Sequence, residues 1–395
     1  MILTRKQQEG LNLCVTRYNN KEAYTCIAGY AGTGKSTLVK FIIAALNLKP
    51  EEEVSYISFT GKAAKVLQQK GCPNAMTAHK LLYKFKLKSD GKYIREPKIT
   101  LDNKNLKLII VDEISMLPKD MWELLLYHKI PIICCGDPEQ LPPINPDTNN
   151  HVLDKPHVFL DEIMRQAEES EIIRLSMHIR EGKSLVDFNC KNEHIKILHP
   201  NEVVNGVYNW GNQIICSTND KRNEINNKVR SLQNFDSTPQ KQDKLISLHN
   251  HWDICSTSGI PLTNGTIGHI DEAWVEIMPL PRYISTDPIQ ILWTDIIADD
   301  GEVYKNLPID YKMLITGKPT VTPKMAYQMR RGKRCPDPPL EFSYGYGITC
   351  HKAQGSEWDK VVIFEQNFPF DKEEHRRWLY TAITRASEKA VIIKK

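Results

Sequence analysis

A glycine-rich segment with the sequence GYAGTGKST constrains the fold of this chain more than any other feature. It spans residues 29–37, fits the pattern GxxxxGK[ST] and lies between the apolar run of residues 23–28 and a helical pattern. In this context glycines let backbone N–H groups wrap phosphates, Lys35 reaches the outer phosphates, and Ser36 can bind magnesium. A chance glycine-rich turn is the alternative, and the flanking strand and helix argue against it. The sequence therefore predicts a site for a nucleoside triphosphate and Mg²⁺, made of Gly29, Gly32, Thr33, Gly34, Lys35, Ser36 and Thr37.

The composition of the 395-residue chain is ordinary for a globular protein, with 41% hydrophobic and 25% charged residues. The length allows more than one domain. Because no long apolar run or N-terminal signal pattern appears, we expect a cytoplasmic protein without a membrane association. The ten cysteines include no CxxC pair, so we expect reduced thiols, most of them in cores. A net charge of +4 permits a nucleic-acid partner without establishing one.

Short apolar runs alternate with helical patterns in two parts of the chain. Continuous apolar strands separated by helices are typical of parallel sheets that helices cover on both faces. The sequence thus predicts an α/β fold with two such cores. The predicted strands are residues 23–28, 54–59, 106–111 and 130–135 in the first core and 213–217, 360–364 and 390–393 in the second, where residues 373–383 are predicted to be a helix.

Two stretches interrupt this alternation and are predicted to be insertions. In the first, polar and apolar residues alternate around Asp90–Gly91, a dipeptide that suits a tight hairpin turn, so that Leu87 would face Ile94. Lys86 would then face Arg95 on the other side of the ribbon. The second stretch is rich in Pro and Gly and predicts a small β-rich module. The predicted boundaries are 1–79 and 108–155 for the first domain, 80–107 for its insertion, 156–244 and 341–395 for the second domain, and 245–340 for its insertion.

Two carboxylates follow the apolar run of residues 109–111. Because ligands of open α/β sheets bind at the carboxyl ends of the strands, we expect Asp112 to hold magnesium through water. Glu113 is then placed to act as the general base toward the attacking water. The next strand ends in GDPEQLPPI, which places Gln140 beside the carboxylates, where a glutamine can sense the γ-phosphate. A proline-stiffened loop is the alternative for this segment, and taken by itself the segment favours it.

Motifs in a fixed order span nearly the whole chain. They are LTRKQ (residues 3–7), GYAGTGKST (29–37), FTGKAA (59–64), TAHKLL (77–82), VDEISM (111–116), GDPEQLPP (136–143), MRQ (164–166), ITCHKAQGSEW (348–358) and YTAITRA (380–386). Together they resemble the superfamily 1 helicases, and within these the RecD-like and Dda-like group, which moves 5′ to 3′. The whole ordered set is far more specific than any one motif.

The resemblance implies two RecA-like domains, with ATP in the cleft between them and single-stranded nucleic acid lying across both. It implies that Gln7 recognises adenine and that Arg165 and Arg385 act as arginine fingers from the second domain. A surface ion pair is the alternative for either arginine. Gly355 and Glu357 match family positions near the nucleotide. The positions that match those facing the nucleic acid are Thr60, Lys62, Thr77, His79, Thr349, His351 (with a structural histidine as the alternative) and Lys352.

The first insertion coincides with the position of a pin-like hairpin that splits the duplex in this family. Residues 80–98 contain seven basic and two acidic side chains, an excess that is also typical of a solvated face. We expect a nucleic-acid phosphate near Lys86 and Arg95, because their like charges would otherwise repel each other. Phe85 and Tyr93 are candidates for stacking on bases. The second insertion matches the family's SH3-like module by position.

Together these features predict an ATP-dependent DNA helicase that moves on single-stranded DNA and separates forked duplex DNA at the pin. The alternatives are an ATP-switched regulatory protein that binds nucleic acid without separating strands, and an RNA helicase of the same superfamily. Because no N-terminal domain precedes Gln7, the resemblance favours the compact phage-type helicases. It implies a monomer that works with replication or recombination proteins and contacts phosphates without reading sequence.

Overall fold

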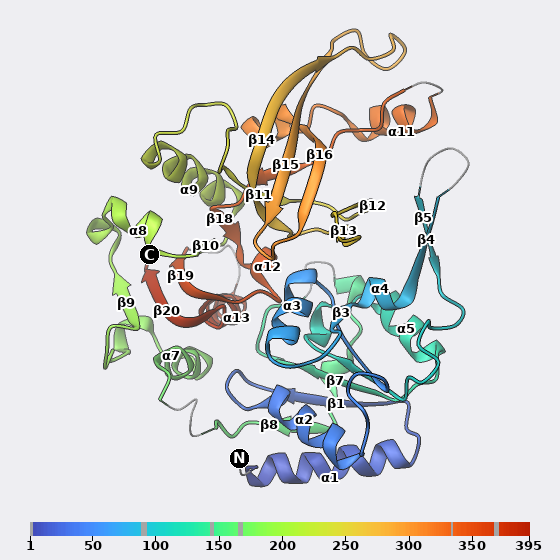
Figure 1. Cartoon of the computed structure of the whole chain (residues 1–395). Coiled ribbons are helices and arrows are strands. Elements are labelled where there is room, and N and C mark those ends of the chain that lie inside the picture. Colours follow the sequence, from blue (N-terminus) through green and yellow to red (C-terminus); the bar gives the residue numbers. More distant parts are fainter. Residues whose placement is uncertain (1–2, 88–92, 143–145, 165–168, 333–334, 367–370) are drawn as a thin grey trace. The chain divides into compact units, whose positions relative to one another are not determined.

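The computed structural model describes residues 3–87, 93–142, 146–164, 169–332, 335–366 and 371–395. They form two compact units (Figure 1). The first unit comprises Met1–Lys84, Arg95–Thr218 and Ile348–Lys395, and the second comprises Phe85–Ile94 and Asn219–Gly347. None of the helices in the described part of the chain has the length and apolar character that a membrane span requires.

A six-stranded parallel sheet lies in the N-terminal half of the first unit, in the order β3-β2-β6-β7-β1-β8. Its four central strands overlap the four apolar runs that predicted them. One edge strand, β8, lies beyond the predicted domain boundary at residue 155, because it pairs with β1. The strands are β1 (Tyr24–Gly29), β2 (Val54–Ser58), β3 (Met76–Thr77), β6 (Leu108–Val111), β7 (Ile132–Gly136) and β8 (Val158–Leu160).

Helices cover both faces of this sheet, as its continuous apolar strands require. On one face Ile109 of β6 packs in the same core as Leu125 of α5. The next residue, Ile110, points to the other face and packs in the same core as Leu38 of α2. Complete burial of such side chains contributes about 2 kcal/mol each. The helices of this half are α1 (Arg5–Asn19), α2 (Lys35–Ala45), α3 (Gly61–Gln69), α4 (Ala78–Leu82) and α5 (Lys119–Tyr127).

A second sheet, of five strands, completes the first unit in the order β18-β10-β19-β20-β9. The pairs β10–β19, β19–β20 and β20–β9 are parallel, as predicted for the second core. Its strands are β9 (Ile195–Leu198), β10 (Gln213–Cys216), β18 (Gly347–Thr349), β19 (Trp358–Phe364) and β20 (Ala386–Ile393), and its helices are α7 (Glu171–Arg180), α8 (Asn205–Trp210), α12 (Cys350–Ala353) and α13 (Lys372–Ile383).

The second unit is built on an antiparallel sheet in the order β16-β15-β14-β11-β17. Figure 1 shows β14, β15 and β16 as long neighbouring strands. The sheet starts and ends slightly outside the predicted β-rich stretch of residues 245–340, because β11 and β17 pair with each other. Its elements are α9 (Asn219–Leu232), β11 (Lys244–Ser247), β12 (His251–Cys255), β13 (Pro261–Leu262), β14 (Ile267–Met278), β15 (Ile289–Ala298), β16 (Val303–Asp310), α10 (Tyr311–Thr316), α11 (Pro323–Arg331) and β17 (Phe342–Tyr344).

The predicted hairpin is present as a two-stranded sheet of β4 (Tyr83–Leu87) and β5 (Tyr93–Pro97). Lys98 fixes its base, because its backbone N–H donates to Leu82 O at 2.8 Å and its Nζ donates to Lys80 O at 3.0 Å. The turn at Asp90–Gly91 lies outside the described residues. So do the side chains of Phe85, Lys86, Leu87, Tyr93, Ile94 and Arg95, whose predicted pairing and contacts therefore remain predictions.

All ten cysteines are free thiols, and seven of them are buried. The two exposed thiols, Cys190 and Cys255, belong to the first and the second unit respectively. Burial raises the pKa of the Cys135 thiol well above its usual value, so that such core thiols stay protonated and unreactive.

Candidate active site

The phosphate-loop segment connects β1 to α2 through two left-handed glycines, Gly32 and Gly34, each with φ of 77°. A Cβ on Gly34 would lie 2.3 Å from Met164 Sδ and 2.5 Å from Gln7 Nε2, so only glycine fits there. Gly34 is the N-cap of α2 and provides no side-chain cap. The backbone N–H groups of the first helical turn therefore keep the capacity to bind an anion, which is the arrangement a phosphate requires.

Lys35, the first residue of α2, directs its ammonium group back onto the loop. Its Nζ donates to Gly29 O at 2.7 Å and to Tyr30 O at 3.1 Å. Both acceptors are neutral main-chain oxygens, and charge-assisted bonds to phosphate oxygens are stronger. A triphosphate in the loop can therefore take over these bonds. Ser36 lies exposed in the same helical turn, and Thr33 is buried with its hydroxyl bonded to Tyr30 O at 2.8 Å.

Gln7 is packed against the phosphate loop, and only 1% of its side chain is exposed. Its Nε2 donates to Thr33 O at 3.0 Å, while its Oε1 accepts from Thr4 N at 3.0 Å as part of the capping box of α1. The structure thus brings Gln7 to the nucleotide site named by the sequence, although its expected contact with adenine stays a prediction. A sequence signal for this position is the T-x-x-Q spacing of a capping box.

Asp112 and Glu113 leave the carboxyl end of β6, as the sequence predicts. Burial, with the charge of Glu113 second, raises the pKa of Asp112 to about 6, against the opposing charge of Lys35. A cation bound at this edge would stabilise the ionised form, so the carboxylate suits magnesium together with the Ser36 hydroxyl. Glu113 has φ of 52°, a left-handed conformation that costs about 1–3 kcal/mol for a residue other than glycine. Such strain is common where a side chain is held for chemistry.

The loop after β7 places Asp137 and Gln140 inside the same half of the protein, with exposed fractions of 2% and 8%. Burial raises the pKa of Asp137, and the charge of Lys35 opposes this shift while that of Glu113 adds to it. Both groups are therefore close enough to Asp137 to act on it electrostatically. The loop lies beside the phosphate site, and the sensing role of Gln140 stays a prediction.

Arg385 follows α13 and is 5% exposed. Its guanidinium donates to Thr381 O at 3.1 Å, Ser356 O at 3.1 Å and Thr384 Oγ1 at 3.2 Å. The three donors are thus bonded within the second core, and a finger role requires them to be released. Arg165, the other predicted finger, lies outside the described residues.

Gly355 and Glu357 face elements of the first core rather than the phosphate loop. Gly355 has φ of 69°, and a Cβ there would lie 3.1 Å from Met116 Sδ and 3.4 Å from Thr60 Oγ1. Glu357 pairs with Lys70, at the end of α3, at 3.0 Å. Their expected place near the nucleotide is therefore not visible as a direct contact with the loop.

The candidate residues for nucleic-acid contact divide into helix caps, packed side chains and half-buried ones. Thr60 and Thr77 cap α3 and α4 with their hydroxyls. The Lys62 ammonium lies 3.6 Å from the centre of the Trp358 ring, a cation–π contact. His79 is 4% exposed and stacks at 6.0 Å on Tyr83. The half-buried ones are Thr349, His351 and Lys352 at the start of α12, where burial lowers the pKa of His351.

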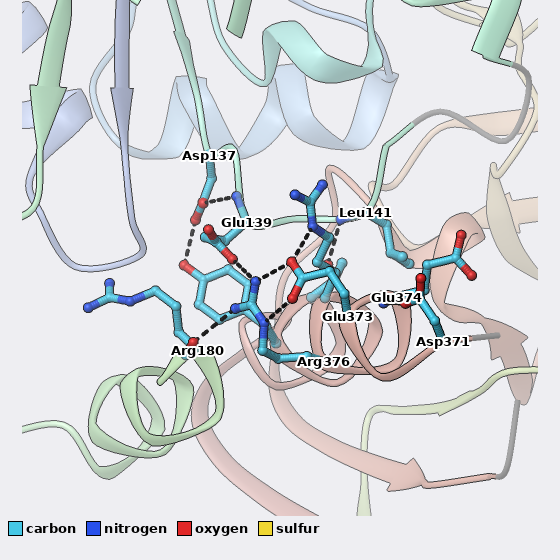
Figure 2. Close-up of polar contacts among 11 residues, drawn as sticks. Asp137, Glu139, Leu141, Arg180, Asp371, Glu373, Glu374 and Arg376 are labelled. Carbon is cyan, nitrogen blue, oxygen red and sulfur yellow. Dashed lines mark hydrogen bonds and ion pairs between the residues drawn. The ribbon is translucent and has the colours of Figure 1, made fainter. Parts of the chain in front are cut away.

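Sequence reasoning missed a group of side chains, on α13 and at Gln354 after α12, that hold the loop after β7. Figure 2 shows Arg376 reaching both Glu139 and Glu373. Tyr380 bonds Asp137 at 2.6 Å. Tyr380 and Glu139 stand inside quoted motifs, which is the signal that was available for them. No sequence signal connects Arg376, on a charged helix face, with Glu139.

Comparison with protein families gives two matches. Residues 3–200 match the family described as AAA domain, and residues 344–393 match the UvrD-like helicase C-terminal domain. The first match contains the whole six-stranded sheet together with β9 of the second sheet, and the second match contains β18, β19 and β20.

Three relatives extend these matches. The ATP-dependent DNA helicase Dda of Enterobacteria phage T4 is 29% identical over 191 residues, which cover 46% of this chain and 43% of the relative. An uncharacterised protein, R530 of Acanthamoeba polyphaga mimivirus, is 26% identical over 98% of this chain and 99% of its own length. The ATP-dependent RecD2 DNA helicase of Deinococcus radiodurans is 25% identical over 92% of this chain. The chain spans less than half the length of the phage T4 and Deinococcus relatives, at 43% and 46%.

Solved structures share the fold. A structure of two coordinating Pif1 helicases at forked double-stranded DNA gives a TM-score of 0.55 at 19% identity, over 99% of this chain and 92% of that one. The Bacteroides Pif1 helicase in complex with ADP-AlF3 and single-stranded DNA gives 0.53 at 18% identity over the same shares. The two-domain α/β architecture with parallel sheets is therefore that of RecA-like helicases.

Proposed function

Because the chain carries an AAA domain and belongs to the superfamily 1 helicases of the Pif1, Dda and RecD-like group, we propose that it uses ATP to move along single-stranded DNA and to separate duplex DNA. One observation carries this proposal. The phosphate loop and the Asp112–Glu113 pair lie at one sheet edge, and side chains of the second core bond to the loop beside them. Chemistry at the nucleotide is thereby linked to the core that carries the second half of the motifs.

The residues of the first core bind the nucleotide and prepare the water. Lys35 and the first turn of α2 bind the phosphates, and Gln7 recognises the base. Ser36 and Asp112 would hold a magnesium ion, whose charge would neutralise that of the phosphate oxygens. Glu113 takes a proton from the attacking water, and Gln140 orients toward the γ-phosphate. Gly355 and Glu357 complete the site from the second core when it approaches.

Arg385 and Arg165 are proposed to complete the transition-state charge compensation from the second core. Three acceptors of its own core hold the Arg385 guanidinium, and these bonds would have to be released before it reaches the phosphates. Its movement toward the phosphates would couple hydrolysis to a movement of the second core. This coupling gives a motor its power stroke.

Single-stranded DNA is proposed to lie along the N-terminal ends of helices in both cores. Thr60, Thr77 and Thr349 begin α3, α4 and α12, and backbone N–H groups at helix starts suit phosphate oxygens. The further candidate contacts are Lys62, His79, His351 and Lys352, and at the hairpin Phe85, Lys86, Tyr93 and Arg95. Contacts of this kind do not read sequence, so we expect salt-sensitive, sequence-tolerant binding.

Partial duplexes with either a 5′ or a 3′ single-stranded tail test the motor and its direction together. We expect ATP-dependent strand separation with the 5′ tail, loss of separation in Lys35→Ala, and weaker separation when Lys86 and Arg95 are both changed to Glu. A strict requirement for the 3′ tail would overturn the proposed 5′ to 3′ direction. ATP turnover on DNA without displacement of a strand or a protein roadblock would instead identify a regulatory switch, and stronger stimulation by matched RNA an RNA helicase.

A further inference from the structure

The segment of residues 137–141 is held by the second core at every second residue. Tyr380 bonds Asp137, Arg376 bonds Glu139, and Leu141 N donates to Thr381 Oγ1 at 2.9 Å. Leu141 O accepts from Gln354 Nε2 at 2.6 Å. The segment contains a turn, in which Gln140 N donates to Asp137 O at 3.4 Å, and the four bonds hold this turn against the second core. This loop therefore follows any movement of α12 and α13.

The Tyr380 hydroxyl has two hydrogen-bond partners, one in the loop after β7 and one in the phosphate loop. The Tyr380 hydroxyl donates to Asp137 Oδ2 at 2.6 Å and accepts from Ala31 N, inside the phosphate loop, at 2.9 Å. Tyr380 is 1% exposed and Asp137 is 2% exposed. Burial raises the pKa of Tyr380 well above its usual value, so that the phenol keeps the proton it donates. The hydroxyl thus connects α13, the loop after β7 and the phosphate loop.

We propose that Tyr380 is a positioning residue that ties the phosphate loop and the segment of residues 137–141 to α13. When the binding of single-stranded DNA moves α12 and α13, the hydrogen bond of the Tyr380 hydroxyl moves the backbone at Ala31 with them. The role rests on the proposed function and deepens it, because it names the contact through which the strand controls ATP turnover. Tyr380 touches no reacting atom.

The neighbouring contacts explain why this hydroxyl can carry the signal. Gln354 directly follows α12, whose first turn contains the candidate strand contacts His351 and Lys352. Thr381, next to Tyr380, bonds the loop through its hydroxyl and accepts from Arg385 through its carbonyl. Bonds from α12 and α13 therefore converge on one short loop, which is a contiguous physical connection between the candidate strand surface and the phosphate loop.

Tyr380→Phe removes the hydroxyl and keeps the ring, so that the packing of α13 is preserved. The change leaves Asp137 Oδ2 and Ala31 N without this partner in a buried place. We expect kcat of the DNA-stimulated ATPase to fall roughly 10- to 100-fold, the cost of a lost bond to a charged group. KM for ATP and the half-saturating DNA concentration should stay within about twofold, since the expected ATP and strand contacts remain.

The matched control is Tyr346→Phe. Tyr346 donates to a buried carboxylate, Asp243, at 2.9 Å in the second unit, so this variant loses the same kind of bond in the unit that does not contain the phosphate loop. Thermal unfolding of both variants measures the structural loss, which should be similar. A drop in kcat for Tyr380→Phe alone supports the proposal. An equal drop in both variants, or an unchanged kcat in Tyr380→Phe, overturns it.

A double-mutant cycle with Asp137→Asn tests the hydrogen bond itself. If Tyr380 and Asp137 act through their mutual hydrogen bond, kcat of the double variant falls no more than about twofold below the lower of the two single-variant kcat values. Independent, multiplying losses would overturn the coupling. A wild-type protein without DNA-stimulated ATP turnover would instead show that the proposed function is wrong, so the two failures are distinguishable.

Discussion

Each of the two parallel sheets of the first unit has a strand–helix loop, and the two loops differ in whether a side chain satisfies their backbone N–H donors. In the first sheet, α2 begins at a left-handed glycine that provides no side-chain cap. In the second, the loop after β10 is closed by Gln366, whose Oε1 accepts from Ser217 N at 3.0 Å, Ser217 Oγ at 2.7 Å and Thr218 N at 3.3 Å. The same α/β architecture can thus leave its backbone donors open for a phosphate or satisfy them internally. The second core instead contributes side chains from its helices.

Removing the Lys35 ammonium group from the uncapped phosphate loop should have the largest effect of the substitutions in the two loops. We expect Lys35→Ala to lower kcat of the ATPase by about 10³-fold, because one preorganised donor to transition-state charge is lost. The folded protein should lose little stability, since Lys35 bonds only neutral carbonyl oxygens among its described contacts. Steady-state ATPase and thermal unfolding measure the two effects. Lys40→Ala, on the exposed side of the same helix, is the control. Residual activity near wild type in Lys35→Ala would show that the site lies elsewhere.

Opening the closed loop should give the opposite pattern, a loss of stability rather than of ATP chemistry. Gln366→Ala leaves the donors of Ser217 and Thr218 without their acceptor, which should cost about 1–3 kcal/mol in the free energy of unfolding. Gln366→Glu keeps an acceptor oxygen and should lose less. Denaturant unfolding compares the two variants. Equal losses in both would contradict the view that the carbonyl oxygen closes this loop.

The smallest expected effect concerns the ion pairs of Arg376, which bonds Glu139 and Glu373. Arg376, more than any other group, lowers the pKa of Glu373 to about 2 from an ordinary 4.5. A carboxylate whose pKa is lowered by folding contributes its full stabilisation at a pH above its ordinary pKa of 4.5. This contribution is lost as the pH falls through about 2. Arg376→Gln should therefore reduce stability by about 1 kcal/mol at neutral pH and flatten the acid limb of thermal unfolding.

Arg377→Gln is the control for this pH dependence, because Arg377 also pairs with Glu373 but has no described bond to Glu139. It should change the acid limb less than Arg376→Gln. An acid limb identical to that of the wild type in Arg376→Gln would show that the Glu373 pair contributes nothing to stability.

The apolar pattern of the sequence predicted the long buried strands and missed the short or interrupted ones. The apolar runs identified β2 and β10 within a residue or two, because strands buried on both faces are mostly apolar, even though β2 contains Ser55 and Ser58 and β10 contains Gln213. It did not predict β9, where a lysine interrupts the apolar pattern, or β8, which has only three residues. Because β8 pairs with β1, the first sheet continues past residue 155, where the sequence placed the domain boundary. The two RecA-like cores themselves are confirmed by the solved helicase structures.

The candidate site divides in the same way. The phosphate loop and the pair Asp112–Glu113 follow directly from strand ends, and the structure places them at one sheet edge. The bond between Tyr380 and Asp137 joins residues 243 positions apart, and no periodicity in the sequence records such a contact. Tertiary packing decides which members of a motif meet. The assigned roles of the site residues therefore remain predictions that the variants above test.

The distribution of thiols has a practical consequence. Cys190 and Cys255 are exposed, one in each unit, while seven other thiols are buried. Maleimide dyes should therefore attach first at these two positions without any engineered cysteine. Burial raises the pKa of both thiols, so labelling should be slow at neutral pH and faster in mildly alkaline buffer. The natural chain thus provides a dye pair whose energy transfer reports the distance between the units as nucleotide and strand are added.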